Sequence, residues 1–441
     1  MGLPIFLTSL TTIIAFLAMF FAPITQLMGF GIVVGFGIFW AWLLSNSLLP
    51  SILLLSRWDL NANFISKLGF LEKFINSIGN IIFHYPRRTL LIGVSFVLLG
   101  LVGISLLKVE VNIIKFFKSE NSIRQSTEFV DENFGGTMSL LMRVNGDMDS
   151  PKTLNRISEI QDYIERYPEV KMTASLSDLI KEAHKTLYND DDFYSIPDSL
   201  NQVRNLLFML PKEQKISFVN TTTYKTGMVH TYLTSLSTNE IVTISNDIES
   251  YINETSNGNL EIETSGLMII LKDFISMIIE SSIISITVSI LAIFIVSFIF
   301  FKRLIWAALS VMPLLSAVIL NFGLMGVFGI RLSHLTALLT SIIIGVGVDF
   351  AVHYISSYRR HCRNESDASK ISMLTINDVG YPIMLDVVSN MGFAALLFSD
   401  IVPLNYMGGL MIFAMISTSF GTFLLMGTTI EIITNNKGKI T

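Results

Sequence analysis

The stretch "LSHLTALLTSIIIGVGVDFAVHYISSYRR" (residues 332–360) decides the fold, because it places an acid inside a long apolar run. A helix of about 20 apolar residues is long enough to cross a bilayer. Asp349 lies about 20 Å along such a helix, at 1.5 Å per residue. A charged aspartate near the bilayer centre costs about 2.5–3.5 kcal/mol on insertion scales. A carboxyl group kept at this depth predicts a functional site inside a membrane.

The composition supports a membrane protein. Hydrophobic residues make up 51% of the 441 residues, and the mean hydropathy is +0.59. Charged residues make up only 15%, against about 25% in soluble globular proteins. The single cysteine, Cys362, excludes an intrachain disulfide and a cysteine-rich metal site. We expect no metal, no cofactor and no nucleic-acid partner.

Eight stretches are long and apolar enough to span a bilayer. Their approximate limits are 5–22, 27–54, 89–107, 273–300, 304–328, 334–356, 381–399 and 404–428. Most lysines and arginines outside the polar block 108–272 fall in loops on one side of this arrangement, and such loops are normally cytoplasmic. The polar block, which is acidic, is therefore expected to face outward.

The predicted domains follow from these spans. They are two transmembrane helices in 1–55, a cytoplasmic amphipathic linker in 56–88, a transmembrane helix in 89–107, an extracytoplasmic domain in 108–272, a five-helix transmembrane bundle in 273–430 and a cytoplasmic tail in 431–441.

The polar block has the pattern of a mixed α+β domain. Strands are predicted at 139–144, 227–236 and 260–266, and helices at 151–167, 174–188 and 238–254. The last helix is preceded by Ser237, with Glu240 at the spacing of a capping box.

An internal repeat relates the beginning and the end of the chain. "GLPIFLTSLTTIIAFLAMFF" (2–21) aligns with "GYPIMLDVVSNMGFAALLFS" (380–399), and three threonines meet polar residues of the second copy. The pairs are Thr8 with Asp386, Thr11 with Ser389 and Thr12 with Asn390. Related halves are typical of transporters. Since an outer domain and three spans precede the second copy, we expect an equivalent leading half outside this chain, in a longer protein or a partner chain.

Polar residues inside the predicted spans are candidates for a proton relay. A carboxyl group held away from water favours its neutral form, so Asp349 could load and release a proton. The other candidates are Asp386, His353, Ser389 and Asn390, with Glu280 and Asn321 as further possibilities, and Gly345 and Gly347 are expected to admit a neighbouring helix. Structural readings compete: a packed hydrogen-bonding Asp349, an interfacial His353, a solvated helix start at Asp386, and interhelical contacts by Ser389 and Asn390.

The segment "GVGVDFAVHYISSYRR" (345–360) resembles the Gly-x-x-x-Asp-Tyr/Phe helix of the resistance-nodulation-division (RND) superfamily. The resemblance is nearest to the mycobacterial-membrane-protein-large (MMPL) type of exporter, whose relatives include Patched-like sterol-sensing proteins. Residues 7–55 resemble the fifth and sixth helices of that fold. In this comparison Asp349 matches the relay acid of the tenth helix, Gly345 is the motif glycine, and Phe350 stands where relatives often have tyrosine.

The resemblance implies a polytopic α-helical membrane protein with about eight transmembrane helices and one extracytoplasmic α+β porter-like domain. It also implies proton-driven export of lipids or other hydrophobic or amphipathic molecules across a bacterial plasma membrane. The family's relay includes a second acid on its fourth helix, which would belong to the leading half. The implied partners are the lipid bilayer, a hydrophobic substrate, that missing half, and further copies of the chain.

Two other functions are open on the sequence. An intramembrane aspartyl protease could use Asp349 and Asp386 as a dyad, although one extra residue separates Asp349 from the Gly-x-Gly pattern and the partner Tyr-Asp pair is absent. A non-transporting sterol-sensing or regulatory subunit could use the same fold, and dependence of substrate movement on a proton gradient would distinguish it from an exporter.

Overall fold

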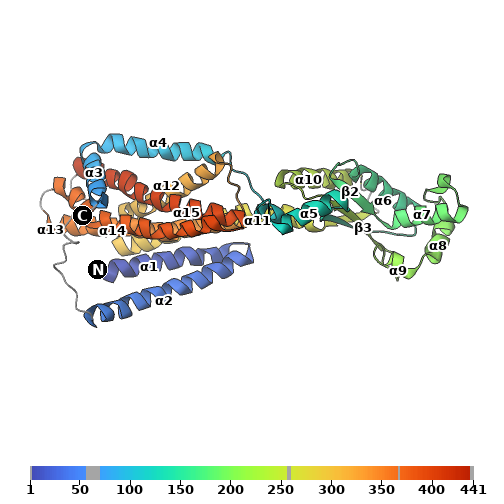
Figure 1. Cartoon of the computed structure of the whole chain (residues 1–441), viewed down its shortest axis with the longest axis horizontal. Helices are drawn as coiled ribbons and strands as arrows, with labels where there is room; N and C mark the ends of the chain where they lie inside the picture. Colours follow the sequence, from blue (N-terminus) through green and yellow to red (C-terminus); the bar gives the residue numbers. More distant parts are fainter. Residues whose placement is uncertain (1, 56–69, 256–259, 366–367, 438–441) are drawn as a thin grey trace. The chain divides into compact units, whose positions relative to one another are not determined.

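The structure, a computed structural model, describes residues 2–55, 70–255, 260–365 and 368–437. The chain divides into two compact units (Figure 1). Unit 1 comprises Met1–Val109 and Met277–Thr441, and unit 2 comprises Glu110–Ser276. The part of the predicted amphipathic linker at 56–69 lies outside the described residues.

Unit 1 is a helical bundle. Its helices are α1 (Gly2–Leu17), α2 (Thr25–Leu55), α3 (Phe70–His84), α4 (Pro86–Ile104), α11 (Leu267–Phe301, which begins in unit 2), α12 (Leu304–Val327), α13 (His334–Asn364), α14 (Ala368–Asn390), α15 (Val402–Phe420) and α16 (Thr428–Lys437). Within the described ranges, 7 candidate spans are long and apolar enough to cross a membrane, and the first predicted span is a shorter apolar helix, Ile5–Phe21. The polytopic helical class predicted from the sequence is confirmed.

Three spans differ clearly from their predicted limits. The sixth was expected to end near residue 356, but α13 continues to Asn364. The seventh was expected to begin near residue 381, but α14 begins at Ala368 and continues as a 3-10 helix, Met391–Phe398. The eighth does not end near residue 428: α15 passes through a π-helical segment, Gly421–Gly427, into α16. The residues 431–437, expected in a tail, are therefore helical.

Helix α13 lies in the middle of unit 1. It packs against α1, α12, α14 and α15, and residues around its whole circumference are buried. A capping box begins it, in which Ser333 and Thr336 satisfy each other's backbone N–H groups. Because α13 is enclosed by other helices, Asp349 lies within the bundle and not on its lipid-facing surface.

Helices α4 and α12 are in backbone contact. Gly100 and Gly103 of α4 lie directly against Gly323 and Gly326 of α12, and a Cβ atom added at Gly103 would come within 2.8 Å of the Gly323 Cα. Small residues at such contacts let membrane helices approach closely, where packing must replace the hydrophobic effect. This pair fixes one wall of the bundle.

Unit 2 contains a sheet of order β2-β3-β1-β4, with all neighbours antiparallel. The strands are β1 (Met138–Asn145), β2 (Val170–Ala174), β3 (Thr226–Leu233) and β4 (Glu261–Ser265). Alternate residues of β1 and β3 are buried, as expected for a sheet with one covered face. Strands β1, β3 and β4 were predicted from the sequence, and β2 was not.

The helices of unit 2 complete an α+β layer. They are α5 (Ser122–Asn133), α6 (Pro151–Ile164), α7 (Leu176–Tyr188), α8 (Leu200–Met209), α9 (Lys212–Lys215) and α10 (Thr238–Thr255). Helices α6 and α10 lie side by side, since the Tyr163 and Tyr251 rings stack with centroids 3.8 Å apart. The capping box predicted before α10 is present, with the Ser237 N–H donating to Glu240 Oε2 at 2.6 Å.

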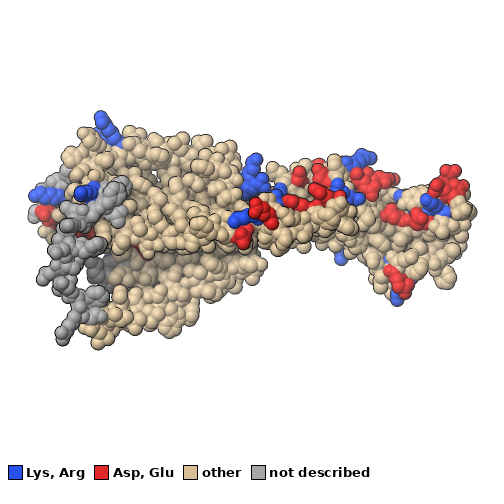
Figure 2. Space-filling model, in the orientation of Figure 1, with Lys and Arg blue, Asp and Glu red and all other residues tan. Residues whose placement is uncertain are grey.

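The surfaces of the two units differ in polarity. Figure 2 shows acidic and basic residues spread over unit 2, whereas the visible flanks of the unit 1 helices carry almost none. Large apolar side chains of α2 and α4 are exposed, among them Val33 at 70% and Val102 at 66%. Exposed apolar surface of this extent is typical of helices that face lipid hydrocarbon.

Candidate functional site

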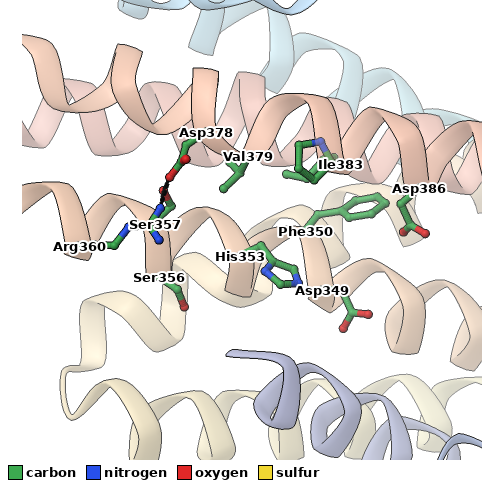
Figure 3. A pocket seen from close by; sticks show the side chains of 11 residues that line it. Asp349, Phe350, His353, Ser356, Ser357, Arg360, Asp378, Val379, Ile383 and Asp386 are labelled. Atoms are coloured by element: carbon green, nitrogen blue, oxygen red, sulfur yellow. Dashed lines mark hydrogen bonds and ion pairs between the residues drawn. The ribbon is translucent and has the colours of Figure 1, made fainter. Parts of the chain in front are cut away.

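A cavity of about 540 Å³ lies between α13 and α14 in unit 1 (Figure 3). Three of the candidate relay residues, Asp349, His353 and Asp386, meet here. The cavity is lined by Asp349, Phe350, His353, Ser356, Ser357, Arg360, Asp378, Val379, Pro382, Ile383 and Asp386.

Asp349 is half-buried at the middle of α13, and α1 supplies its hydrogen-bond partner. The Thr12 hydroxyl donates to Asp349 Oδ1 at 3.4 Å. The same hydroxyl is 2.9 Å from the carbonyl oxygen of Gly345 and 2.9 Å from that of Thr8. A hydroxyl has one proton to donate, so these acceptors are alternatives. Thr12 can therefore satisfy either the carboxyl group or the backbone.

The glycines before Asp349 contact different neighbours of α13. A Cβ atom at Gly345 would lie 3.2 Å from Phe16 Cε2 of α1. A Cβ atom at Gly347 would lie 2.7 Å from Thr418 Cγ2 of α15 and 3.0 Å from Leu314 Cδ2 of α12. The glycines thus allow α13 to be packed tightly on the sides that do not face the cavity.

Asp386 lines the cavity from α14. Because α14 begins at Ala368, Asp386 lies deep in its helix, and the alternative of a solvated helix start is wrong. The Asn390 side chain donates to Asp386 Oδ1 at 3.2 Å. The carboxyl groups of Asp349 and Asp386 are close enough to interact electrostatically. Two carboxylates in one poorly solvated site repel each other, which disfavours the state with both charged.

Ser389 does not join this group. It is exposed on α14 and does not line the cavity, so its part in the relay stays a prediction. Residues three apart on a helix differ by about 60° in direction. That rotation is enough to turn Ser389 away from the cavity, while Asn390 still reaches the Asp386 carboxyl group.

His353 and Phe350 fill the middle of the cavity wall. His353 is half-buried, one helical turn after Asp349, and its ring lies in the cavity (Figure 3). Phe350 is 2% exposed, and its ring reaches toward Ile383 and Asp386 (Figure 3). Phe350 therefore lies against the wall between the two helices without offering a hydroxyl group.

A charged cluster that the sequence analysis did not find closes the other end of the cavity. Asp378 of α14 forms an ion pair with Arg360 and accepts a hydrogen bond from the Ser357 hydroxyl at 2.7 Å. His361 Nε2 lies 3.2 Å from the same carboxyl group. Arg359, Arg360 and Asp378 all lie between the predicted spans 334–356 and 381–399, where charged residues indicate a solvated loop. The acid before the repeat was the signal that could have indicated this cluster.

Other polar residues of the spans lie elsewhere. Glu280 is exposed on α11. Asn321 is buried between α12 and α15, where its amide lies 3.4 Å from the Ser417 hydroxyl. Glu431 of α16, expected in the tail, is 1% exposed and hydrogen-bonded by Ser372 and Asn435. In the part of the chain that the structure describes, no three His, Cys, Asp or Glu residues gather in a way that could hold a metal ion.

Comparisons with known proteins agree on one group. The sequence model of the MMPL family matches residues 2–69 and 228–430. A membrane protein of Methanocaldococcus jannaschii, MJ1562, is 23% identical over 309 residues, which cover 67% of this chain and 76% of that relative.

Solved structures share the fold at low sequence identity. The hedgehog release protein Disp of the water bear Hypsibius dujardini matches with a TM-score of 0.67 and 14% identity over 97% of this chain. A heavy metal efflux pump matches with a TM-score of 0.60 and 12% identity over 98% of this chain. In each case the chain spans 58% of the length of the matched structure.

The helical bundle, the membrane acid at its centre and the inserted α+β unit define a multi-pass membrane protein with the RND transporter fold. The chain belongs to the MMPL family. The resemblance stated from "GVGVDFAVHYISSYRR" is thus confirmed at the level of family and fold.

Proposed function

We propose that the chain is the C-terminal part of a proton-driven exporter of lipids or other hydrophobic or amphipathic molecules. The observation that carries this proposal is the position of Asp349. This acid lies at the centre of an enclosed helix and at one end of a cavity, and the other end of the cavity is lined by polar and charged residues. Burying an acid in such surroundings costs free energy, and acids inside membrane spans are therefore usually functional.

The cavity offers a path for protons. It extends from Asp349 to Arg360, positions that lie about 16 Å apart along a straight helix. The basic residues of α13 after Tyr358 fall on the side predicted to be cytoplasmic. His353 and the cluster around Asp378 lie between these ends and can pass or hold protons. In this scheme Asp349 exchanges protons with the cytoplasm through the cavity.

Thr12 couples the charge of Asp349 to α1. When Asp349 is charged, its carboxylate is the strongest nearby acceptor, and the Thr12 hydroxyl donates to it. When Asp349 is protonated, the hydroxyl can return to the carbonyl oxygens of Gly345 or Thr8. Loading a proton therefore moves the Thr12 hydrogen bond from the carboxyl group of α13 to a backbone carbonyl of α13 or of its own helix. One proton moving down about 100 mV supplies roughly 2.3 kcal/mol for such a rearrangement.

The proposal includes parts beyond this chain. The chain spans 58% of the length of each matched structure, and its internal repeat pairs α1 with the helix that carries Asp386. A second relay acid would come from a leading half, in a longer protein or a partner chain, with further copies assembling around it. Unit 2 would lie outside a bacterial plasma membrane and contact the substrate. Membership in a family with the RND fold favours transport over peptide cleavage by Asp349 and Asp386.

The test is the Asp349→Asn variant in the complete assembly, reconstituted in liposomes with an imposed proton gradient. The probe is a fluorescently labelled phospholipid. We expect gradient-driven movement of the probe to be lost, while the matched change Glu280→Gln, an acid of α11 outside the cavity, retains it. Unchanged movement in Asp349→Asn would rule out the relay. Absence of gradient-driven movement in the unmodified protein would favour a non-transporting, sterol-sensing type of role.

A further inference from the structure

A second cavity in unit 1 is almost entirely apolar. It has a volume of about 530 Å³ and lies between α4, α12 and the segment from Leu425 to Ile433. Its walls include Val94 and Leu98 of α4 and Leu315 of α12, whose side chains are 41%, 56% and 42% exposed. Since these helices are candidate membrane spans, the groove lies in the part of unit 1 expected to cross the bilayer.

A basic cavity adjoins the groove and is also lined by residues of α4 and α16. It has a volume of about 390 Å³ and is lined by His84, Tyr85, Pro86, Arg87 and Arg88 together with Ile432 and Asn435 of α16. Along α4, Arg88 and Val94 are about 9 Å apart. Along α16, Ile432 of the basic cavity is next to Ile433 of the groove. The basic cavity is therefore the mouth of the apolar groove at the end of the span.

The arginines of this mouth have positive charge available for a ligand. Arg87 and Arg88 are exposed, and the Arg88 guanidinium lies 5.5 Å from the centroid of the Tyr85 ring. Among the residues that the structure describes, no carboxylate forms an ion pair with either arginine. The nearby acid of α16, Glu431, is buried and hydrogen-bonded by Ser372 and Asn435.

We propose that the mouth and the groove together bind one anionic phospholipid of the surrounding bilayer. The phosphate group would lie against Arg87 and Arg88, whose guanidinium groups match phosphate oxygens in geometry and charge. One acyl chain would occupy the groove beside Val94 and Leu98. Basic pockets between membrane helices are suited to anionic headgroups in this way. The site shares no residue with the cavity around Asp349, so it is independent of the proton relay.

Native mass spectrometry of the intact protein in detergent tests the headgroup. We expect phosphatidylglycerol to be retained about tenfold better than phosphatidylcholine with the same acyl chains. The double variant Arg87→Gln/Arg88→Gln should lose this preference. The control Lys73→Gln/Arg363→Gln removes the same charge from exposed residues outside the site and should keep it. Equal retention of the two lipids, or equal loss in the two double variants, would overturn the proposal.

The groove is tested separately with Ala308→Phe, which places a ring where the acyl chain would lie. We expect severalfold weaker retention of phosphatidylglycerol, whereas Ser95→Phe, on α4 but outside the groove, should have no effect. Thermal unfolding of each variant verifies that it is folded. Full retention in Ala308→Phe, or displacement of the lipid by millimolar inorganic phosphate alone, would show that the acyl chain is not held there and would contradict the proposal.

Discussion

At the residue scale, the hydroxyl group of Thr12 connects α1 to the acid of α13. Thr12 is the one donor that the described residues bring to Asp349, and it is also within reach of the Gly345 carbonyl oxygen. Thr12→Val keeps the shape of the side chain and removes the hydrogen bond. Hydrogen bonds to charged groups contribute about 1.5–3 kcal/mol, so we expect proton-driven transport by the complete assembly to fall by about tenfold or more.

Thr11→Val is the matched control for Thr12. Its hydroxyl is buried and donates only to the carbonyl oxygens of Leu7 and Thr8 within its own helix. We expect this variant to retain transport at a similar level of folded protein. Equal loss of transport in the two variants would show that the hydroxyl at Thr12 has no special connection to Asp349.

Glu240 gives a pH-dependent prediction in unit 2. The hydrogen bonds from the Ser237 hydroxyl and backbone N–H lower the pKa of Glu240 below its ordinary value. A carboxylate with a lowered pKa stabilises the folded state above its unfolded pKa, which is about 4.3, and this contribution is lost as the pH falls through the folded pKa. We expect Glu240→Gln to be less stable than the unmodified protein at pH 6, with a difference that shrinks as the pH falls below the unfolded pKa. Thermal unfolding across that range measures the difference, and a difference that does not change with pH would contradict this account.

The residues that the sequence could and could not indicate differ in their chemistry. Asp349 and Asp386 stand out because an acid in an apolar run is rare. Thr12 does not stand out, because the hydroxyl of a helical threonine usually donates a hydrogen bond to the carbonyl oxygen three or four residues earlier. Its alignment with Asn390 was the available signal. Asp378 falls between predicted spans and Glu431 in the predicted tail, where acids need no explanation.

At the element scale, the contact between α4 and α12 depends on glycine. A methyl group at Gly103 would press on the backbone of Gly323, which cannot move aside as a side chain can. Overpacking of this kind costs about 1–3 kcal/mol. We expect Gly103→Ala to lower the midpoint of thermal unfolding in detergent. Gly37→Ala, at a helical glycine with nothing within 4 Å, should leave the midpoint unchanged or raise it, and the reverse order would disprove the role of the contact.

The elements with strong periodicity could be predicted, and the others depend on tertiary contacts. β1, β3 and β4 are alternating or β-branched runs, whereas β2, "VKMTA", is short and is ordered by pairing with β3. Helix α14 begins before its apolar run because Asp378 is paired with Arg360, which allows a polar segment to continue as a helix against α13. Neither pairing can be derived from local composition.

At the scale of the whole molecule, orientation in the membrane follows from charge. The basic residues between the spans predict that Lys302, in the turn between α11 and α12, is cytoplasmic and that unit 2 is on the opposite side. Single cysteines at Lys302 and at Lys212, both exposed, test this in a chain with Cys362→Ser. We expect a membrane-impermeant thiol reagent added to intact cells to label only Lys212→Cys. Labelling of Lys302→Cys without permeabilisation would reverse the orientation.

The wide turn at Gly421–Gly427 has a mechanical consequence. In a π-helical turn each hydrogen bond closes over one more residue than in an α-helical turn, so the segment contains a surplus residue. If that surplus residue migrated along the helix, every position it passed would advance by about 1.5 Å and rotate by about 100°. Glu431 would then swing off Ser372 without any bond in the chain being strained. The π-helical segment would thus allow α16 to shift and rotate relative to α15, which packs on α13.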